Sequence, residues 1–123
     1  GLKLVENYSY MRMYKKHDVL FKHKDRPECE ISCTMNIGGD EWPIFFKEKK
    51  SKKIKVVLKA GDLVIYKGCD LHHWREPFQG ENCTQVFLHY SPANKKNIEA
   101  TKYDGKLFLG LPLQYAKDNS RFD

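Results

Sequence analysis

The sequence predicts an all-β fold, a sandwich or barrel of about eight short strands. Short runs rich in β-branched and aromatic residues recur about every ten residues. Turn signals containing Gly, Asp or Asn separate these runs. Strands of this number and spacing suit a double-stranded β-helix, or jelly roll. The length of 123 residues indicates a single domain over residues 1–123. A missing N-terminal segment could extend it.

The predicted strands follow one another along most of the chain. The first alternates apolar and polar residues, and the third is a β-rich run that ends at the turn Gly-Gly-Asp, 38–40. In chain order the strands are predicted at residues 8–14, 19–24, 29–37, 42–47, 53–58, 63–67, 71–76 and 83–90. Residues 92–100 resemble a short helix, and the C-terminal tail 103–123 is predicted to add a strand or to pack across the barrel.

The positive charge is concentrated in one stretch. Residues 47–59 hold seven lysines and one glutamate, a local excess equal to the formal net charge of +6. Such a stretch can be a patch that binds nucleic acid or another acidic surface. It can also be a solvated hairpin tip whose lysines protect an exposed strand edge. We favour the hairpin because no aromatic residue, of the kind that stacks on bases, lies among the lysines.

Cysteine usage and hydropathy bear on the compartment. The four cysteines are Cys29, Cys33, Cys69 and Cys83, and no two of them form a Cys-x-x-Cys motif. There is no secretory signal pattern and no apolar run of the ~20 residues that span a membrane. We therefore expect reduced thiols in a cytoplasmic protein with no membrane partner, with two disulfides as the alternative.

Candidate metal ligands lie in two predicted strands that are far apart in the sequence. His23 and Asp25 are two residues apart at the end of the second predicted strand, and His72 and His73 lie in the seventh. A jelly roll brings strands that are distant in sequence together across its mouth. Because side chains alternate along a strand, only one of the two neighbouring histidines can face inward. Two histidines and a carboxylate on one face are the ligand set of non-haem iron(II) oxygenases.

Four sequence blocks resemble the prolyl-4-hydroxylase-like branch of the iron(II)- and 2-oxoglutarate-dependent oxygenases. They are "RMYKKHDVLFKHKD", "CEISCTMNIGG", "AGDLVIYKGCDLHHWREPF" and "QVFLHY", and the resemblance covers about residues 8–90. It implies that His23, Asp25 and His73 are the catalytic iron ligands and that His72 faces outward. It also implies 2-oxoglutarate as cosubstrate, with ascorbate as an optional cofactor, and hydroxylation of a C–H bond. The substrate could be a prolyl or other protein side chain, a small molecule or a nucleobase.

The resemblance also indicates where 2-oxoglutarate would bind. Tyr14 stands where the family often carries a tyrosine that hydrogen-bonds the cosubstrate. The family usually has an Arg or Lys at the start of the final strand for the far carboxylate of 2-oxoglutarate. Here that region reads "ENCT", with Cys83 near the expected position.

Arg75 is the predicted replacement for this missing basic residue. Residues two apart on a strand share a face, so an inward His73 places Arg75 inward as well. A buried guanidinium requires an anionic partner, and a carboxylate fits its planar fork. Arg12 and Gln85 could assist in binding the cosubstrate. The competing prediction is an internal ion pair of Arg75 with Glu28 or Glu30.

Three other functions remain open. "HDVLFKHKDRPECE" and "AGDLVIYKGCDLHH" loosely follow the two motifs of cupins, which indicates a cupin-type metalloenzyme or metal-binding protein without 2-oxoglutarate. A metal-free binding module on the same fold and a basic nucleic-acid binder are the others. We expect His17 and His89 to be structural or surface histidines rather than ligands.

Overall fold

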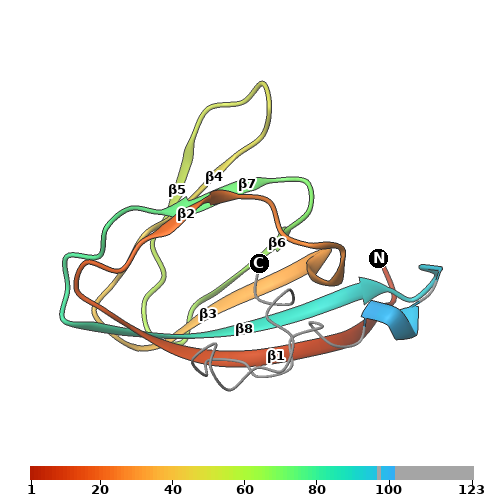
Figure 1. The fold of residues 1–123 in the computed structure, drawn as a ribbon, viewed down its shortest axis with the longest axis horizontal. Coiled ribbons are helices and arrows are strands. Elements are labelled where there is room, and N and C mark those ends of the chain that lie inside the picture. The colour runs from red at the N-terminus through yellow and green to blue at the C-terminus, as the bar shows by residue number, and fades with distance from the viewer. Residues whose placement is uncertain (97, 102–123) are drawn as a thin grey trace, which may run out of the picture.

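Two four-stranded antiparallel sheets face each other in the computed structural model, which describes residues 1–96 and 98–101 (Figure 1). The first sheet has the order β1-β8-β3-β6, and the second has the order β2-β7-β4-β5. The strands of the first sheet are β1 (Leu4–Lys15), β8 (Asn82–Pro92), β3 (Ile31–Gly39) and β6 (Leu63–Lys67). Those of the second are β2 (Leu20–His23), β7 (His72–Arg75), β4 (Ile44–Lys47) and β5 (Ile54–Val56). The predicted jelly roll of eight strands is confirmed.

The ends of the chain differ from the prediction. β1 begins at Leu4 rather than at residue 8, because Leu4 pairs with Pro92, and a register shift between Glu6 and Ser9 hides the early part of the strand from a simple alternation pattern. The helix predicted over 92–100 is wrong. Pro92 is still part of β8, and among the described residues of this range helical structure is limited to the 3-10 turn η2 (Ile98–Thr101). The tail 103–123 lies outside the described residues.

The predicted third strand also begins later than expected. Residues 27–29 form a 3-10 turn, η1 (Pro27–Cys29), in which Cys29 N donates to Arg26 O at 2.8 Å. Pro27 favours such a turn because it has no N–H to donate and its φ is fixed near the helical value. β3 then starts at Ile31 and runs between β6 and β8.

Two apolar clusters hold the sheets together. One consists of Tyr14, Trp42, Phe78, Cys83 and Phe87, and the other of Ile44, Phe46 and Tyr66. Polar side chains are buried on the inner faces alongside these clusters: Ser32, Thr34, Asn36, His73, Arg75, Gln85 and His89. Burying so many polar groups in a small domain is costly unless each finds a partner, so this part of the interior is the place to look for a site.

The cysteines are not paired with one another. All four carry free thiols, and Cys29, Cys33 and Cys83 are buried. Across residues 1–96 and 98–101, we find no helix that could cross a membrane.

Candidate metal centre

Three side chains converge between the two sheets. His23 ends β2 and pairs directly with His73 of the neighbouring strand β7, which brings their ring centroids to 4.3 Å. Asp25 lies two residues beyond His23, in the segment that leads to η1. One ligand atom from each of the three lies within 4.8 Å of the others. The structure thus brings together the three residues that the sequence predicted as ligands.

Backbone carbonyls orient both imidazole rings. His23 Nδ1 lies 2.7 Å from Phe21 O, and His73 Nδ1 lies 3.0 Å from Leu71 O. A carbonyl oxygen can only accept, so Nδ1 of each ring carries the hydrogen and Nε2 of the neutral ring keeps a lone pair. The two Nε2 atoms lie 3.2 and 3.1 Å from Asp25 Oδ1. With both rings neutral, three acceptor atoms converge on one point, and a proton or a metal ion between them would relieve their mutual repulsion.

The charge of the site follows from these contacts. Burial alone would raise the pKa of Asp25, but the hydrogen bonds with His23 and His73 outweigh burial and hold that pKa well below its usual range. The hydrogen bond to Asp25 raises the pKa of His23, although burial opposes this. Without a metal, a proton is the cation that the cluster attracts. A divalent metal would take its place, because metals bind the neutral imidazole and the ionised carboxylate.

Ser32 and Gly68 fix the carboxylate of Asp25 from behind. Ser32 Oγ donates to Asp25 Oδ2 at 3.1 Å, on the oxygen that does not face the histidines. A Cβ at Gly68 would lie 2.3 Å from Asp25 Oδ2 and 2.4 Å from Cys29 O, so only glycine fits there. Asp25 N also donates to Gly68 O at 2.8 Å. These contacts leave Oδ1 as the oxygen presented to a metal.

His89 extends this network into the first sheet. Its Nδ1 lies 3.0 Å from Ser32 Oγ, and its side chain is only 5% exposed. The Ser32 hydroxyl has one hydrogen, so when it donates to Asp25, Nδ1 of His89 must donate to Ser32. We expected His89 to be a structural or surface histidine rather than a ligand. It is buried and lies outside the ligand cluster, so it is a structural histidine. Sequence alone did not connect it to Asp25.

Arg75 points into the same interior, where no described residue offers it a carboxylate. It is 2% exposed. Its guanidinium donates to Trp42 O, lies 3.4 Å from Gln85 Oε1 and sits 5.1 Å from the centroid of the Trp42 ring. Burial lowers the pKa of Arg75. Among the described residues no Asp or Glu forms an ion pair with it.

The competing ion pair of Arg75 with Glu28 or Glu30 is therefore wrong. Glu30 pairs instead with Lys95, at 3.0 Å from Nζ to Oε2. Glu28 lies in η1, and its Oε2 is buried without a hydrogen-bond partner among the described residues. Neither carboxylate neutralises Arg75, so the guanidinium remains a buried cation.

Two of the other predicted cosubstrate residues are buried and one is exposed. Tyr14 is buried with its ring centroid 4.9 Å from that of Trp42, and among the described residues its hydroxyl makes no hydrogen bond. Gln85 is buried and contacts Arg75. Arg12 pairs with Gln85 in the β1–β8 register but lies exposed, with its guanidinium 4.9 Å from the centroid of the Tyr14 ring.

Two neighbours of His73 complete the description. His72 pairs with Lys47 rather than with the inner residues and is not among the clustered ligands, as predicted. Tyr66 was missed. Its ring centroid is 4.9 Å from that of His73, and burial followed by the charge of Asp25 raises its pKa above the usual value. Alternation in 63–67 could have placed it inward with Val64, but its approach to His73 depends on how the two sheets pack.

Comparisons with known proteins support the fold. No protein-family model matches the sequence, and no curated protein matches it. Among solved structures, a 2OG-Fe(II) oxygenase family oxidoreductase from Burkholderia pseudomallei is similar with a TM-score of 0.67 and 15% identity, over 78% of this chain and 47% of that chain. Drosophila melanogaster CENP-C bound to CAL1 is similar with a TM-score of 0.56 and 10% identity, over 66% of this chain and 62% of that chain.

A CENP-C cupin domain from Drosophila melanogaster is also similar, with a TM-score of 0.52 and 11% identity, over 66% of this chain and 59% of that chain. The alignments span less than two thirds of each of these structures. At such identities the likeness establishes a cupin-like jelly-roll fold, and the chemistry must be argued from the residues of this chain.

Proposed function

We propose that this chain is an iron(II)- and 2-oxoglutarate-dependent dioxygenase that hydroxylates a C–H bond. The observation that supports it most directly is the convergence of His23 Nε2, His73 Nε2 and Asp25 Oδ1 on one point. Two imidazoles and one carboxylate on one face are the ligands of non-haem iron(II) oxygenases. The likeness of the fold to a 2OG-Fe(II) oxygenase family protein is in line with this assignment.

The chain's own residues orient the ligands that would hold a divalent ion. Bound iron(II) would keep open positions for 2-oxoglutarate and oxygen and would supply the oxidation of the C–H bond. The chain's own share is to orient the ligands and to shield the site. Carbonyls of residues 21 and 71 hold the two rings, and Ser32 holds the carboxylate. Outer contacts of this kind are known to affect metal affinity strongly.

A metal-binding experiment tests the proposal. We expect about one iron(II) or manganese(II) per chain by anaerobic titration, and 2-oxoglutarate-dependent oxygen uptake with succinate formation. Asp25→Ala and His73→Ala should lose the metal while keeping the fold. His72→Ala is the matched control and should keep its affinity, because His72 lies outside the ligand cluster. Undiminished metal binding by both ligand variants would end the proposal.

Arg75 is proposed to hold the far carboxylate of 2-oxoglutarate. It is a buried cation without an anionic partner in the described part of the chain, and such a group needs a counter-ion. Gln85 contacts it, and Tyr14 lies nearby with its hydroxyl available among the described residues. The guanidinium is also on the same face of β7 as the ligand His73.

The prediction for Arg75 separates cosubstrate binding from metal binding. Arg75→Met should keep the metal and lose 2-oxoglutarate affinity by about 2–4 kcal/mol, or roughly thirty- to a thousand-fold. The control is Arg12→Met, which removes an exposed arginine whose guanidinium lies over the Tyr14 ring and should have a much smaller effect. Titration with 2-oxoglutarate after saturation with manganese measures the cosubstrate affinity of both variants. An unchanged affinity in Arg75→Met would make Arg75 structural.

A cupin-type metalloprotein without 2-oxoglutarate is the second candidate. The observation in its favour is Cys83, which is fully buried where the oxygenases usually carry a basic residue. In that case the protein should bind the metal equally well with and without 2-oxoglutarate, and its oxygen uptake should not depend on 2-oxoglutarate.

A further inference from the structure

A cationic face with an aromatic centre covers the outer side of the second sheet. Side chains alternate along each strand, so the residues that do not face the core gather on this side. We define the cationic face as Lys22 on β2, His72 and Trp74 on β7, Phe45 and Lys47 on β4, and Lys53 and Lys55 on or beside β5. The sequence had indicated lysines without aromatic neighbours in 47–59, and the folded sheet supplies those neighbours from other strands.

A continuous row crosses the face from one edge of the sheet to the other. Lys22 Nζ lies 5.0 Å from the centroid of the Trp74 ring, and the Trp74 ring stacks on Phe45 at 5.6 Å and 17°. On the far side, Lys53 Nζ lies 4.7 Å from the centroid of the Phe45 ring. The row thus places one ammonium on each outer side of an aromatic pair.

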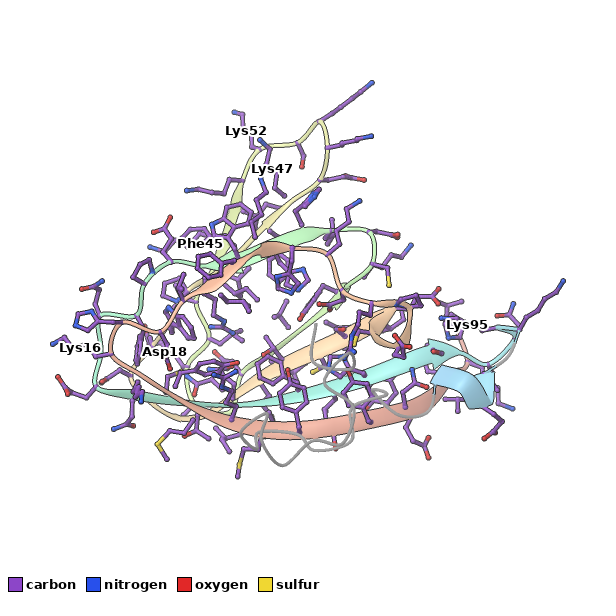
Figure 2. All side chains as sticks on the ribbon, in the orientation of Figure 1. Lys16, Asp18, Phe45, Lys47, Lys52 and Lys95 are labelled. Atoms are coloured by element: carbon purple, nitrogen blue, oxygen red, sulfur yellow. The ribbon has the colours of Figure 1, made fainter. Side chains whose placement is uncertain are left out.

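More cations flank this row. Lys55 pairs with Phe45, and Lys47 pairs with His72, so both lie beside the aromatic pair. The hairpin between β4 and β5 projects beyond the sheets, and Figure 2 shows Lys47 and Lys52 on it with Phe45 at its base. The acidic side chain of Glu76 also borders this face, with its Oε1 4.0 Å from Lys53 Nζ.

Protection of the sheet edges accounts for only part of this distribution. β2 and β5 are the two edge strands, and lysines on them discourage pairing with another chain. Lys47, however, lies on the inner strand β4, and the ammonium groups of Lys22 and Lys53 lie over aromatic rings of the inner strands β7 and β4. Neighbouring strands are about 4.8 Å apart, so these ammonium groups are spread over a width of roughly 14 Å. That spread matches an extended anionic chain better than a single small anion.

We propose that the cationic face binds single-stranded nucleic acid, with the lysines on the phosphates and a base stacked on Trp74. Trp74 is half-buried, and one side of its ring is supported by Phe45. The other side is covered by the exposed, flexible side chain of Lys22. A base can replace this ammonium on the ring, which frees Lys22 for a phosphate. Basic grooves with aromatic stacking surfaces are how proteins hold single strands without sequence preference.

This face and the metal centre lie on opposite sides of β7. His73 points inward and Trp74, the next residue, points outward. The nucleic-acid proposal therefore stands independently of the proposed oxygenase function, and its experiment needs no metal.

The proposal can be tested by fluorescence anisotropy. A labelled single-stranded oligonucleotide of mixed sequence is titrated with the full chain at several salt concentrations. The variant Lys22→Gln/Lys47→Gln/Lys55→Gln should bind more weakly and show a salt slope smaller by about 2, since each phosphate contact contributes ≈ 0.7 for single strands. The matched control is Lys3→Gln/Lys15→Gln/Lys67→Gln, which changes the net charge equally on or next to the other sheet. Equal losses in both variants would overturn the proposal.

A second variant tests the stacking. Trp74→Leu keeps an apolar side chain over Phe45 and should lose about 5- to 150-fold in affinity for the single strand. Tryptophan fluorescence should be quenched on binding in the parent protein and not in this variant, because Trp42 is buried. Thermal unfolding checks the fold. Unchanged affinity in Trp74→Leu, or tighter lysine-dependent binding to anionic phospholipid vesicles than to the oligonucleotide, would overturn the proposal.

Discussion

At the scale of single residues, the hydroxyl of Ser32 links the metal centre to the first sheet. Its oxygen lies within 3.1 Å of Asp25 Oδ2, and within 3.0 Å of both Cys29 O and His89 Nδ1. Removing it would take away the hydrogen bond that holds Asp25 Oδ2 and would leave His89 without this partner. Buried groups that lose a hydrogen bond are costly, at about 1–3 kcal/mol.

We therefore predict that Ser32→Ala weakens metal binding about 10- to 100-fold, the range typical of outer contacts to metal ligands. Thr34→Val is the control, because Thr34 lies on the same face of β3 and contacts Gln85 rather than Asp25. Manganese titration of both variants measures the effect. The positioning role would be refuted if Ser32→Ala bound manganese as tightly as Thr34→Val while both unfolded at similar temperatures.

At the scale of strands and turns, alternation along each strand predicted most of the architecture. Alternation required one of His72 and His73 to face inward, the family resemblance selected His73, and alternation then placed Arg75 inward as well; β7 has this arrangement. Alternation failed where pairing overrides local pattern. Pro92 reads as a helix start, yet it extends β8 because Leu4 lies opposite it.

Long-range contacts were beyond a strand-by-strand prediction. Ser32 and His89 are directly paired across β3 and β8, and nothing local in "CEISC" or "FLHY" indicates that register. Tyr66 similarly reaches His73 only through the packing of one sheet on the other. The His-x-Asp pair was predictable because its spacing is local, whereas the choice of His73 over His72 came from the family resemblance.

At the scale of the whole molecule, the metal centre couples stability to pH. The pKa of His23 is raised in the folded state, so its ion pair with Asp25 stabilises the fold fully below the ordinary histidine pKa of about 6.5. That contribution is lost as pH rises through the raised value. The lowered pKa of Asp25 adds stability that is present above about 3.9, the unfolded value, and is lost as pH falls through the lower folded value.

The metal-free protein should therefore unfold at a lower temperature at pH about 8.5 than at pH about 6. A divalent metal should reverse this trend, because it binds neutral imidazoles and competes with the proton. At about 100 times its Kd, manganese should add about 2.7 kcal/mol to the free energy of unfolding, and the gain should be larger at the higher pH. Thermal unfolding with and without manganese at both pH values measures this. Asp25→Asn should remove both effects, since it deletes the charge that raises the pKa of His23 and supplies the metal ligand. A manganese-dependent stabilisation that is equal in Asp25→Asn and in the parent protein would place the metal elsewhere on the chain.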